Sequence, residues 1–375
     1  MPEQAPLHPV VRHHLGALTD DVGIVRDAIG SRPDPSHGYR TEDVALALLV
    51  DLLHGRELGW PAVADSAWRS VRFIGAAFDP AVGRFRSLRR IDGSWADGIG
   101  SEACHGRAIW ALGEAVAISP DRALTESAAA LLTRALPATG GLTVARAQAS
   151  ALLGCDAALR AAPGRATARA HRQLAERLGE AFRPGAASAW PWPEPQLASE
   201  NGLPVQALIV AGVRLGSRPM VDGGLELLDW LISVQTAPAG HLFPIGDGWS
   251  PIGGEIPAFD QRPIEATSLL LAAEVAYRAT DHGRYRIAME RAYAWFLGRN
   301  DLRVEVADPA SGASGDGLTP RGVDANQGAE STLAWLIALE HVRSLRGERS
   351  FAARSQAPGH VALPSTDELT QVAVS

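Results

Sequence analysis

Apolar residues recur at three- and four-residue spacing along most of the chain, in segments rich in Ala, Leu and Arg. This spacing places apolar side chains on one face of an α-helix, whereas the two-residue alternation of β-strands is scarce. The pattern predicts twelve helices, with bounds accurate to about two to four residues. They cover 9–18, 41–55, 61–78, 103–118, 121–136, 145–160, 165–182, 203–215, 219–235, 263–279, 283–297 and 327–344.

The connections between these helices are of two kinds. Some are tight, such as Ser119-Pro120, and tight links join antiparallel neighbours. Others are long and rich in Gly, Pro, Trp and acidic residues, and long ordered links are more often functional than neutral. The long links are 79–102, 183–202, 236–262 and 298–326.

Polar, aromatic or acidic clusters precede the second, fourth, eighth, tenth and twelfth helices. In an up-and-down array the N-termini of alternate helices lie at the same end, so these clusters should converge on one face. Twelve alternating helices that close on themselves form an (α/α)6 toroid, with six inner helices around a funnel and six outer helices around them. The alternative is an open α-solenoid of the TPR or HEAT type, but no fixed repeat of 34 to 47 residues is present.

The domain organisation follows from the same pattern. We expect one toroid domain over residues 1–345. Residues 346–375 are polar and contain Pro358 and Pro364, so we expect a disordered tail there.

Composition excludes several classes of function. The chain has 375 residues, a net charge of −7, and 35 basic residues that are all arginine. Without lysine there is no pyridoxal-phosphate Schiff base, no lysine aldolase and no standard Walker A loop. The negative charge argues against nucleic-acid binding, and no stretch reaches 18 apolar residues, so no membrane span is expected. With two cysteines and no visible signal peptide, we expect a cytoplasmic protein.

Motifs for metals and for common nucleophiles are absent. The sequence has no HExxH, CxxC, GxSxG or GxGxxG, so we expect no metal and no cofactor. Carboxylates mixed with aromatic residues in the long links remain. Aromatic faces stack on pyranose rings, polar side chains bond the hydroxyl groups, and a pair of carboxylates can cleave a glycosidic bond. The pattern therefore indicates an oligosaccharide or polysaccharide ligand.

Two carboxylates outside the predicted helices and next to aromatic residues, Asp260 and Glu194, are the candidate catalytic pair. A larger group is expected to position or stack on the sugar: Asp43, Glu102, His105, Arg107, Trp190, Trp192, Asn201, Gln261, Asp316, Asn326 and Gln327. Structural roles remain open for several of these residues. First-turn carboxylates often cap helices, Trp190 and Trp192 could pack within their proline-rich loop, and His105 could be a core histidine.

The same motifs resemble a known group, the bacterial six-hairpin glycosidase-like domains found beside or fused to glycosyltransferases. The similarity runs from about Asp20 to Leu345. It is carried by FDQRPIEA at 259–266, WFLGRND at 295–301, DGL at 316–318 and NQGAES at 326–331, together with SE at 101–102 and HGRA at 105–108. The resemblance implies an (α/α)6 fold, a carbohydrate ligand and a glycosyltransferase as a possible partner.

The chain departs from the family pattern in its N-terminal half. Residues 38–46 read GYRTEDVAL where the family has a pattern like GYCTDDNARAL, and Ala103 replaces an acidic residue. Three hypotheses follow. The first is a glycoside hydrolase-like enzyme that uses carboxylate acid/base catalysis. The second is a catalytically impaired glycan-binding partner of a glycosyltransferase, and the third is a sugar epimerase, which would need histidine acid/base pairs.

Overall fold

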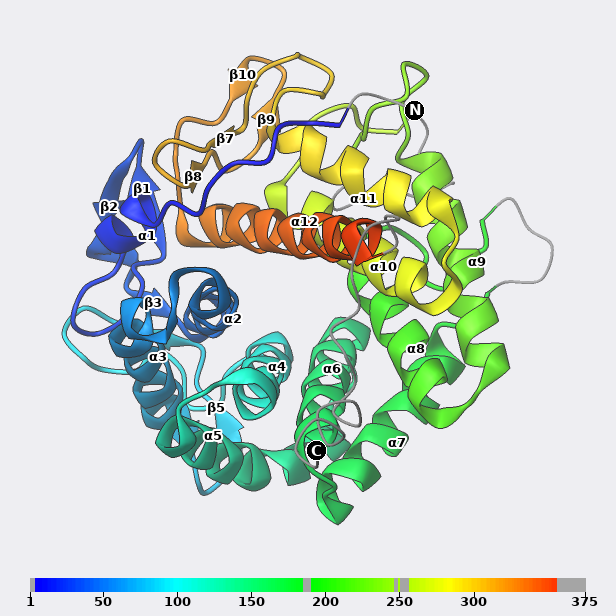
Figure 1. The fold of residues 1–375 in the computed structure, drawn as a ribbon. Coiled ribbons are helices and arrows are strands. Elements are labelled where there is room, and N and C mark those ends of the chain that lie inside the picture. Colours follow the sequence, from blue (N-terminus) through cyan, green and yellow to red (C-terminus); the bar gives the residue numbers. More distant parts are fainter. Residues whose placement is uncertain (1–3, 185–189, 246–248, 250–255, 356–375) are drawn as a thin grey trace, which may run out of the picture.

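The computed structural model describes residues 4–184, 190–245, 249 and 256–355. This part of the chain contains twelve α-helices, and Figure 1 shows their arrangement. Their bounds are α1 His13–Leu18, α2 Thr41–Leu58, α3 Ala64–Ala77, α4 Glu102–Ile118, α5 Arg122–Ala135, α6 Ala145–Ala161, α7 Arg165–Ala181, α8 Gly202–Leu215, α9 Arg218–Val234, α10 Pro263–Thr280, α11 Gly283–Phe296 and α12 Ala329–Ser355. Short 3-10 helices cover Pro35–His37, Trp60–Ala62 and Leu136–Gly141.

Six of these helices form a closed inner ring. Helices α2, α4, α6, α8, α10 and α12 each contact the next, and α12 contacts α2 to close the ring. Helices α3, α5, α7, α9 and α11 pack around the outside (Figure 1). The fold is therefore an (α/α)6 toroid, as predicted, because an open solenoid would not bring its first and last inner helices into contact.

The burial of the two layers explains the sequence pattern. Inner helix α2 buries twelve of its residues around most of its circumference, including polar Thr41, Asp43, Asp51 and His54. Outer helix α7 buries one face only, through residues such as Ala170, Leu174 and Leu178. A helix enclosed by neighbours must be apolar on nearly all sides, whereas one that faces solvent needs a single apolar stripe.

The sixth outer position, between α12 and α2, is occupied by the short helix α1. Sequence periodicity predicts a helix over 9–18, but α1 begins at His13. The segment before it lies against the loop at Gly312, where a Cβ would overlap the carbonyl of Val11. His14 donates its backbone N–H to the carbonyl of Ser311 at 2.9 Å. Pairing with this loop takes the place of the first helical turns.

The contact between α4 and α6 is unusually close because it is made by glycines. A Cβ on Gly113 would overlap the backbone of Gly154, and a Cβ on Gly154 would overlap the carbonyl of Ile109. Nearer the N-terminus of α4, a Cβ on Gly106 would likewise overlap the carbonyl of Ala147 in α6. The two inner helices therefore meet backbone to backbone over most of their length.

The long links contain small antiparallel strand pairs that periodicity does not predict. The pairs are β1 Asp27–Ile29 with β2 Arg32–Asp34, β3 Tyr39–Arg40 with β6 Leu88–Arg89, β4 Phe78–Asp79 with β5 Arg84–Phe85, β7 Ala307–Asp308 with β8 Ala313–Ser314, and β9 Leu318–Thr319 with β10 Gly322–Val323. Most of these links precede an inner helix, so they lie at the end of the ring where the inner N-termini lie. This end is called the mouth below.

The C-terminal helix is longer than predicted. Helix α12 continues to Ser355, beyond the predicted helix end at 344 and the predicted domain end at 345. The rest of the expected tail, 356–375, lies outside the described residues. Within the described chain, no helix is both long and apolar enough to span a membrane.

Candidate active site at the mouth of the ring

A polar cavity of about 390 Å³, the mouth cavity, opens at the mouth of the ring. Four segments far apart in sequence form its walls: the start of β1, the start of α2, the link before α10, and the link that leads into α12. Its lining is Arg26, Asp27, Arg40, Asp43, Asp260, Arg262, Asp316, Gly317, Leu318, Thr319, Asp324, Gly328, Glu330 and Ser331. The structure thus brings predicted site residues Asp43, Asp260 and Asp316 to one cavity.

Asp43 is the most perturbed carboxyl group in this cavity. It lies in the first turn of α2, is 1% exposed, and neither of its oxygens has a hydrogen-bond partner in the described part of the chain. Burial raises its pKa to about 7, and the Glu330 and Glu42 carboxylates add to the rise, while Arg40 opposes it. Asp43 can therefore exchange a proton near neutral pH, as a general acid or base must.

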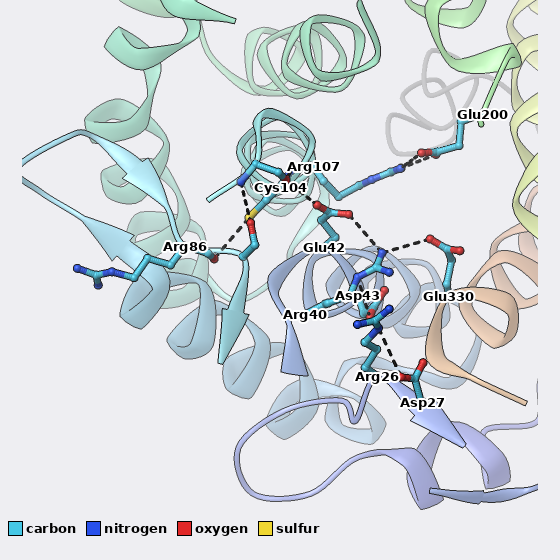
Figure 2. A network of polar contacts seen from close by, with 12 residues as sticks. Arg26, Asp27, Arg40, Glu42, Asp43, Arg86, Cys104, Arg107, Glu200 and Glu330 are labelled. Carbon is cyan, nitrogen blue, oxygen red and sulfur yellow. Dashed lines mark hydrogen bonds and ion pairs between the residues drawn. The ribbon is translucent and has the colours of Figure 1, made fainter. Parts of the chain in front are cut away.

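Arg40 joins the carboxylates around Asp43 (Figure 2). Its guanidinium lies 3.3 Å from both Glu42 and Glu330, and its Nε lies 3.5 Å from Asp43. Glu42 also accepts a hydrogen bond from Ser101 at 3.0 Å. Because Arg40 is shared among three carboxylates, it neutralises none of them fully, which leaves the raised pKa of Asp43 in place.

Asp260 is exposed at the cavity and has a left-handed backbone, with φ of 64°. Its neighbour Gln261 is fully buried and holds the loop in this conformation. The backbone of Gln261 pairs in both directions with Leu318, and its side chain donates to Asp301 at 2.6 Å and accepts from Trp295 at 2.8 Å. Non-glycine residues adopt positive φ at a cost and often at functional sites, because the surrounding structure enforces it. Gln261 thus anchors the loop from which Asp260 lines the cavity.

Asp316 lies beside the start of α12. Its carboxylate accepts the backbone N–H of Gly328 at 3.0 Å, and burial raises its pKa, while Ser331 and Gly328 oppose the rise. The predicted residues Asn326 and Gln327 bind the link before α12 to the N-terminal part of the chain. Asn326 Oδ1 accepts the N–H of Gly30 at 3.1 Å, and the carbonyl of Gln327 pairs with the His14 ring at 2.9 Å. These two residues anchor the wall and do not line the cavity.

A second polar group lies farther across the ring, centred on the buried Arg107 of α4. Arg107 forms an ion pair with both carboxylate oxygens of Glu200, as Figure 2 shows. The Glu200 backbone N–H in turn donates to Glu265 of α10, and Asn201 donates to Glu265 at 3.3 Å. Burial raises the pKa of Glu265 to about 8. Arg107 and Asn201 thus connect α4, α8 and α10 to one another.

Glu194, one of the two predicted catalytic carboxylates, does not line the mouth cavity. It forms a two-pronged ion pair with Arg146 at 2.8 and 2.9 Å, and it accepts from the indole of Trp192 at 3.2 Å. Arg146 also bonds the carbonyl of Ser199 and the side chain of Asn201. This geometry fixes the 190–201 link to α6 and favours a structural role for Glu194.

We expect Glu194→Gln to lower stability. Arg146 would lose one arm of a charge-assisted pair, which costs about 1–3 kcal/mol of unfolding free energy. Urea unfolding followed by circular dichroism measures this change. An unchanged midpoint together with loss of carbohydrate turnover would instead support the catalytic role predicted from the sequence.

The predicted stacking residues Trp190 and Trp192 are part of an aromatic cluster. Trp192 is 3% exposed, stacks on Trp230 at 6.0 Å and meets Phe182 edge-on at 5.2 Å. Trp190 meets Trp230 at 5.0 Å and Trp249 at 5.1 Å. The buried indole of Trp192 offers no face to a sugar in this structure, so the loop-packing interpretation fits it.

Predicted residues Glu102 and His105 lie at the start of α4, away from the mouth cavity. Glu102 accepts hydrogen bonds from Thr143 and from the backbone of Val144 at 2.7 Å, so it caps the segment before α6. His105 is fully buried 5.4 Å from the ring of Phe85, and burial lowers its pKa to about 4. A neutral, enclosed imidazole fits a core histidine.

Sequence reasoning missed Arg26 and Asp27 as cavity residues. Asp27 begins the β1–β2 hairpin and Arg26 directly precedes it, and the three-residue strands of this hairpin are too short to show a period. His37 pairs with Asp27 at 2.6 Å and thereby contacts the rim. No pattern in the sequence would have selected this hairpin. Among the described residues, no group of three or more His, Cys, Asp or Glu could hold a metal ion.

Comparisons with known proteins identify the fold and no closer relationship. No family model matches the chain, and no curated protein matches it. Among solved structures, a sugar epimerase from a ruminal bacterium superimposes with a TM-score of 0.69 at 13% identity, over 88% of this chain and 96% of that one. A D-mannose isomerase gives 0.69 at 12% identity, over 88% and 94%. A GH76 α-mannanase from Bacteroides thetaiotaomicron gives 0.60 at 10% identity, over 91% and 96%.

These similarities define the class of structure. The chain has the six-hairpin glycosidase fold that these sugar-processing enzymes share, as the resemblance implied. Nothing in the comparisons supports the expected association with glycosyltransferases.

Proposed function

We propose that the chain is a carbohydrate-active enzyme of the glycoside hydrolase type, with its active site in the mouth cavity. One observation carries the proposal: the buried Asp43, whose oxygens accept no hydrogen bond from the described residues, shares a cavity with the exposed Asp260. Glycosidases use two carboxyl groups in different environments, one that holds a proton and one that is ionised. The solved structures of similar fold, which include an α-mannanase and a sugar epimerase, are consistent with a sugar ligand.

In this proposal Asp43 is the general acid. Its pKa of about 7 keeps a substantial protonated fraction at neutral pH. It can therefore deliver a proton to the glycosidic oxygen as the bond breaks. Burial sets most of this shift, Glu330 adds to it and Arg40 opposes it, so we regard these two residues as adjusting the pKa of Asp43.

Asp260 is the second carboxylate, acting as base or nucleophile. It is exposed to the cavity and held by the strained loop before α10. This proposal keeps Asp260 in its predicted role and replaces Glu194 by Asp43. The hydroxyl groups of the sugar would bond Asp27, Asp316 and Arg262, whose side chains line the same cavity.

The cavity favours hydrolysis over epimerisation and over glycan binding alone. No histidine is among the described residues that line it, and the enclosed His105 lies elsewhere. An epimerase would need imidazoles or similar groups placed for proton exchange at carbon. A site that only binds sugar would gain nothing from leaving a buried carboxyl group without a hydrogen bond, because that costs free energy.

The test is turnover of a broad oligosaccharide panel, with products measured by mass spectrometry in H2O and D2O. Hydrolysis shortens the oligosaccharide, whereas epimerisation by proton exchange keeps its length and adds carbon-bound deuterium. We expect shortened products, and we expect Asp260→Asn to reduce their rate by about 10²–10⁴-fold. Asp222→Asn, an exposed carboxylate on outer helix α9, is the matched control.

Two results would contradict the proposal. Deuterium incorporation without shortening would establish an epimerase. Full activity of the folded Asp260→Asn variant would move the reaction to another carboxylate.

A further inference from the structure

A second cavity, the outer cavity, lies on the outside of the ring and is independent of the proposed function. It has a volume of about 640 Å³. One face of helix α11 forms its floor, and the turn at 239–241, the loop at 298–303 and the N-terminal residues 4–5 form its rim. Among the described residues, none lines both this cavity and the mouth cavity.

The outer cavity is basic in a protein of net charge −7. Four arginines line it: Arg286, Arg291, Arg299 and Arg303. Glu290, the acidic residue among the described residues of the lining, already forms an ion pair with Arg346. Arg291 and Arg303 take part in no ion pair within the described chain. The cavity therefore carries excess positive charge, which favours an anion.

The loop that carries two of these arginines is rigidly held. Buried Asn300 donates to the carbonyls of Trp295 at 3.0 Å and Val304 at 2.8 Å, and it accepts the N–H of Val304. Arg303 has φ of 56°, which is unfavourable for a residue with a side chain. Backbone strain of this kind persists where the surrounding structure enforces it, and here it fixes the backbone of Arg303 at the cavity rim.

The walls also contain apolar surface. Ile287 and Ala294 of α11 and Ala239 of the adjacent turn line the cavity between the arginines. A bare tetrahedral anion needs only a small part of 640 Å³, which is a volume typical of sites for small organic molecules. The occupant should therefore combine an oxyanion with an apolar body.

We propose that the outer cavity binds a small organic phosphate or sulfate ester. The forked guanidinium groups of Arg291 and Arg303 bind the tetrahedral oxyanion, because arginine matches such groups in both geometry and charge. The body of the ester packs on Ile287 and Ala294. Phosphate and sulfate esters present the same chemistry here, and the experiment separates them.

The experiment is isothermal titration calorimetry of the full chain with phenyl phosphate, phenyl sulfate, inorganic phosphate and phenol. We expect one of the two esters to bind more tightly than inorganic phosphate, and phenol to show no measurable binding. The double variant Arg291→Gln/Arg303→Gln should weaken binding of the ester by at least about tenfold, because it removes two charge-assisted contacts to the oxyanion. The tighter ester identifies the source of the oxyanion.

Two control variants test whether the ester binds in the outer cavity or elsewhere on the protein. Arg165→Gln removes an exposed arginine from α7, and Arg262→Gln removes one from the mouth cavity. Both should retain the ester affinity of the unmodified chain. The proposal is overturned by an ester affinity that survives the double variant, by an equal loss in Arg262→Gln, or by the absence of ester binding to the folded protein.

Discussion

Asp43→Asn should abolish carbohydrate turnover while making the protein more stable at alkaline pH. An amide has nearly the same shape but delivers no proton, so the rate should fall by about 10²–10⁴-fold, the usual contribution of a general acid. In the unmodified protein, activity that depends on protonated Asp43 should decline as the pH rises above about 7. Asp222→Asn again provides the control for a carboxylate lost elsewhere.

The stability effect follows from the direction of the pKa shift. The folded-state pKa of Asp43 is raised from an ordinary value of 3.8 to about 7, so the folded state favours the protonated carboxyl group. The contribution of Asp43 to the free energy of unfolding is therefore most favourable below about pH 4. This contribution is lost as the pH rises through about 7. Asparagine removes the cost of ionisation, about 2–4 kcal/mol when fully developed at pH 8.

Urea unfolding at pH 5 and pH 8 measures this difference. We expect the variant to gain more stability relative to the unmodified protein at pH 8 than at pH 5. An equal gain at both pH values would show that Asp43 does not titrate between them. Loss of stability at pH 8 would mean that its charge is needed to hold Arg40.

Gly154→Ala should strongly destabilise the ring. The new Cβ would overlap the backbone of Ile109 on α4, and a backbone cannot rotate away as a flexible side chain can. Helices α4 and α6 would have to separate along their glycine contact, at a cost of about 3 kcal/mol or more of unfolding free energy. Thermal and urea unfolding measure the loss.

Gly75→Ala is the matched control. Gly75 lies inside outer helix α3, and its Cβ would meet only the side chain of Leu131 at an ordinary 3.6 Å. Alanine in a helix interior is favoured over glycine by about 0.5–1 kcal/mol, so this variant should gain stability. Similar behaviour of the two variants would show that the α4–α6 contact is looser than the structure indicates.

The helices could be predicted because each has a long apolar pattern, whereas the residues that line the mouth cavity could be predicted only in part. Asp43 was selected as a sugar-positioning residue, since its first-turn position gives no sign of complete burial. Its raised pKa depends on burial in the folded ring and on the charge of Glu330, which is far away in the sequence. Glu194 and Trp192 have the residue types of a sugar site, but their partners Arg146 and Trp230 could be identified only in three dimensions.

The glycine contact was likewise beyond the sequence pattern. Gly113 and Gly154 fit a helical period as well as alanine would, and nothing local indicates that two backbones meet there. The strand pairs in the links are two or three residues long, which is too short for an alternation to be visible. These features arise from tertiary contacts, and local propensity carries no information about them.

The closure of the ring by α12 against α2 also sets the order in which the protein can fold. The two helices lie at opposite ends of the chain, so their contact has the largest sequence separation in the inner layer. During synthesis, we expect a nascent chain that ends before Ala329 to lack ring closure, because the surfaces of α2 and α10 that contact α12 would have no partner. Contacts of such long range form slowly, and chains that wait for them are prone to aggregate. Helix α12 thus covers the flanks of both α2 and α10, and it can do so only after the other inner helices have been made.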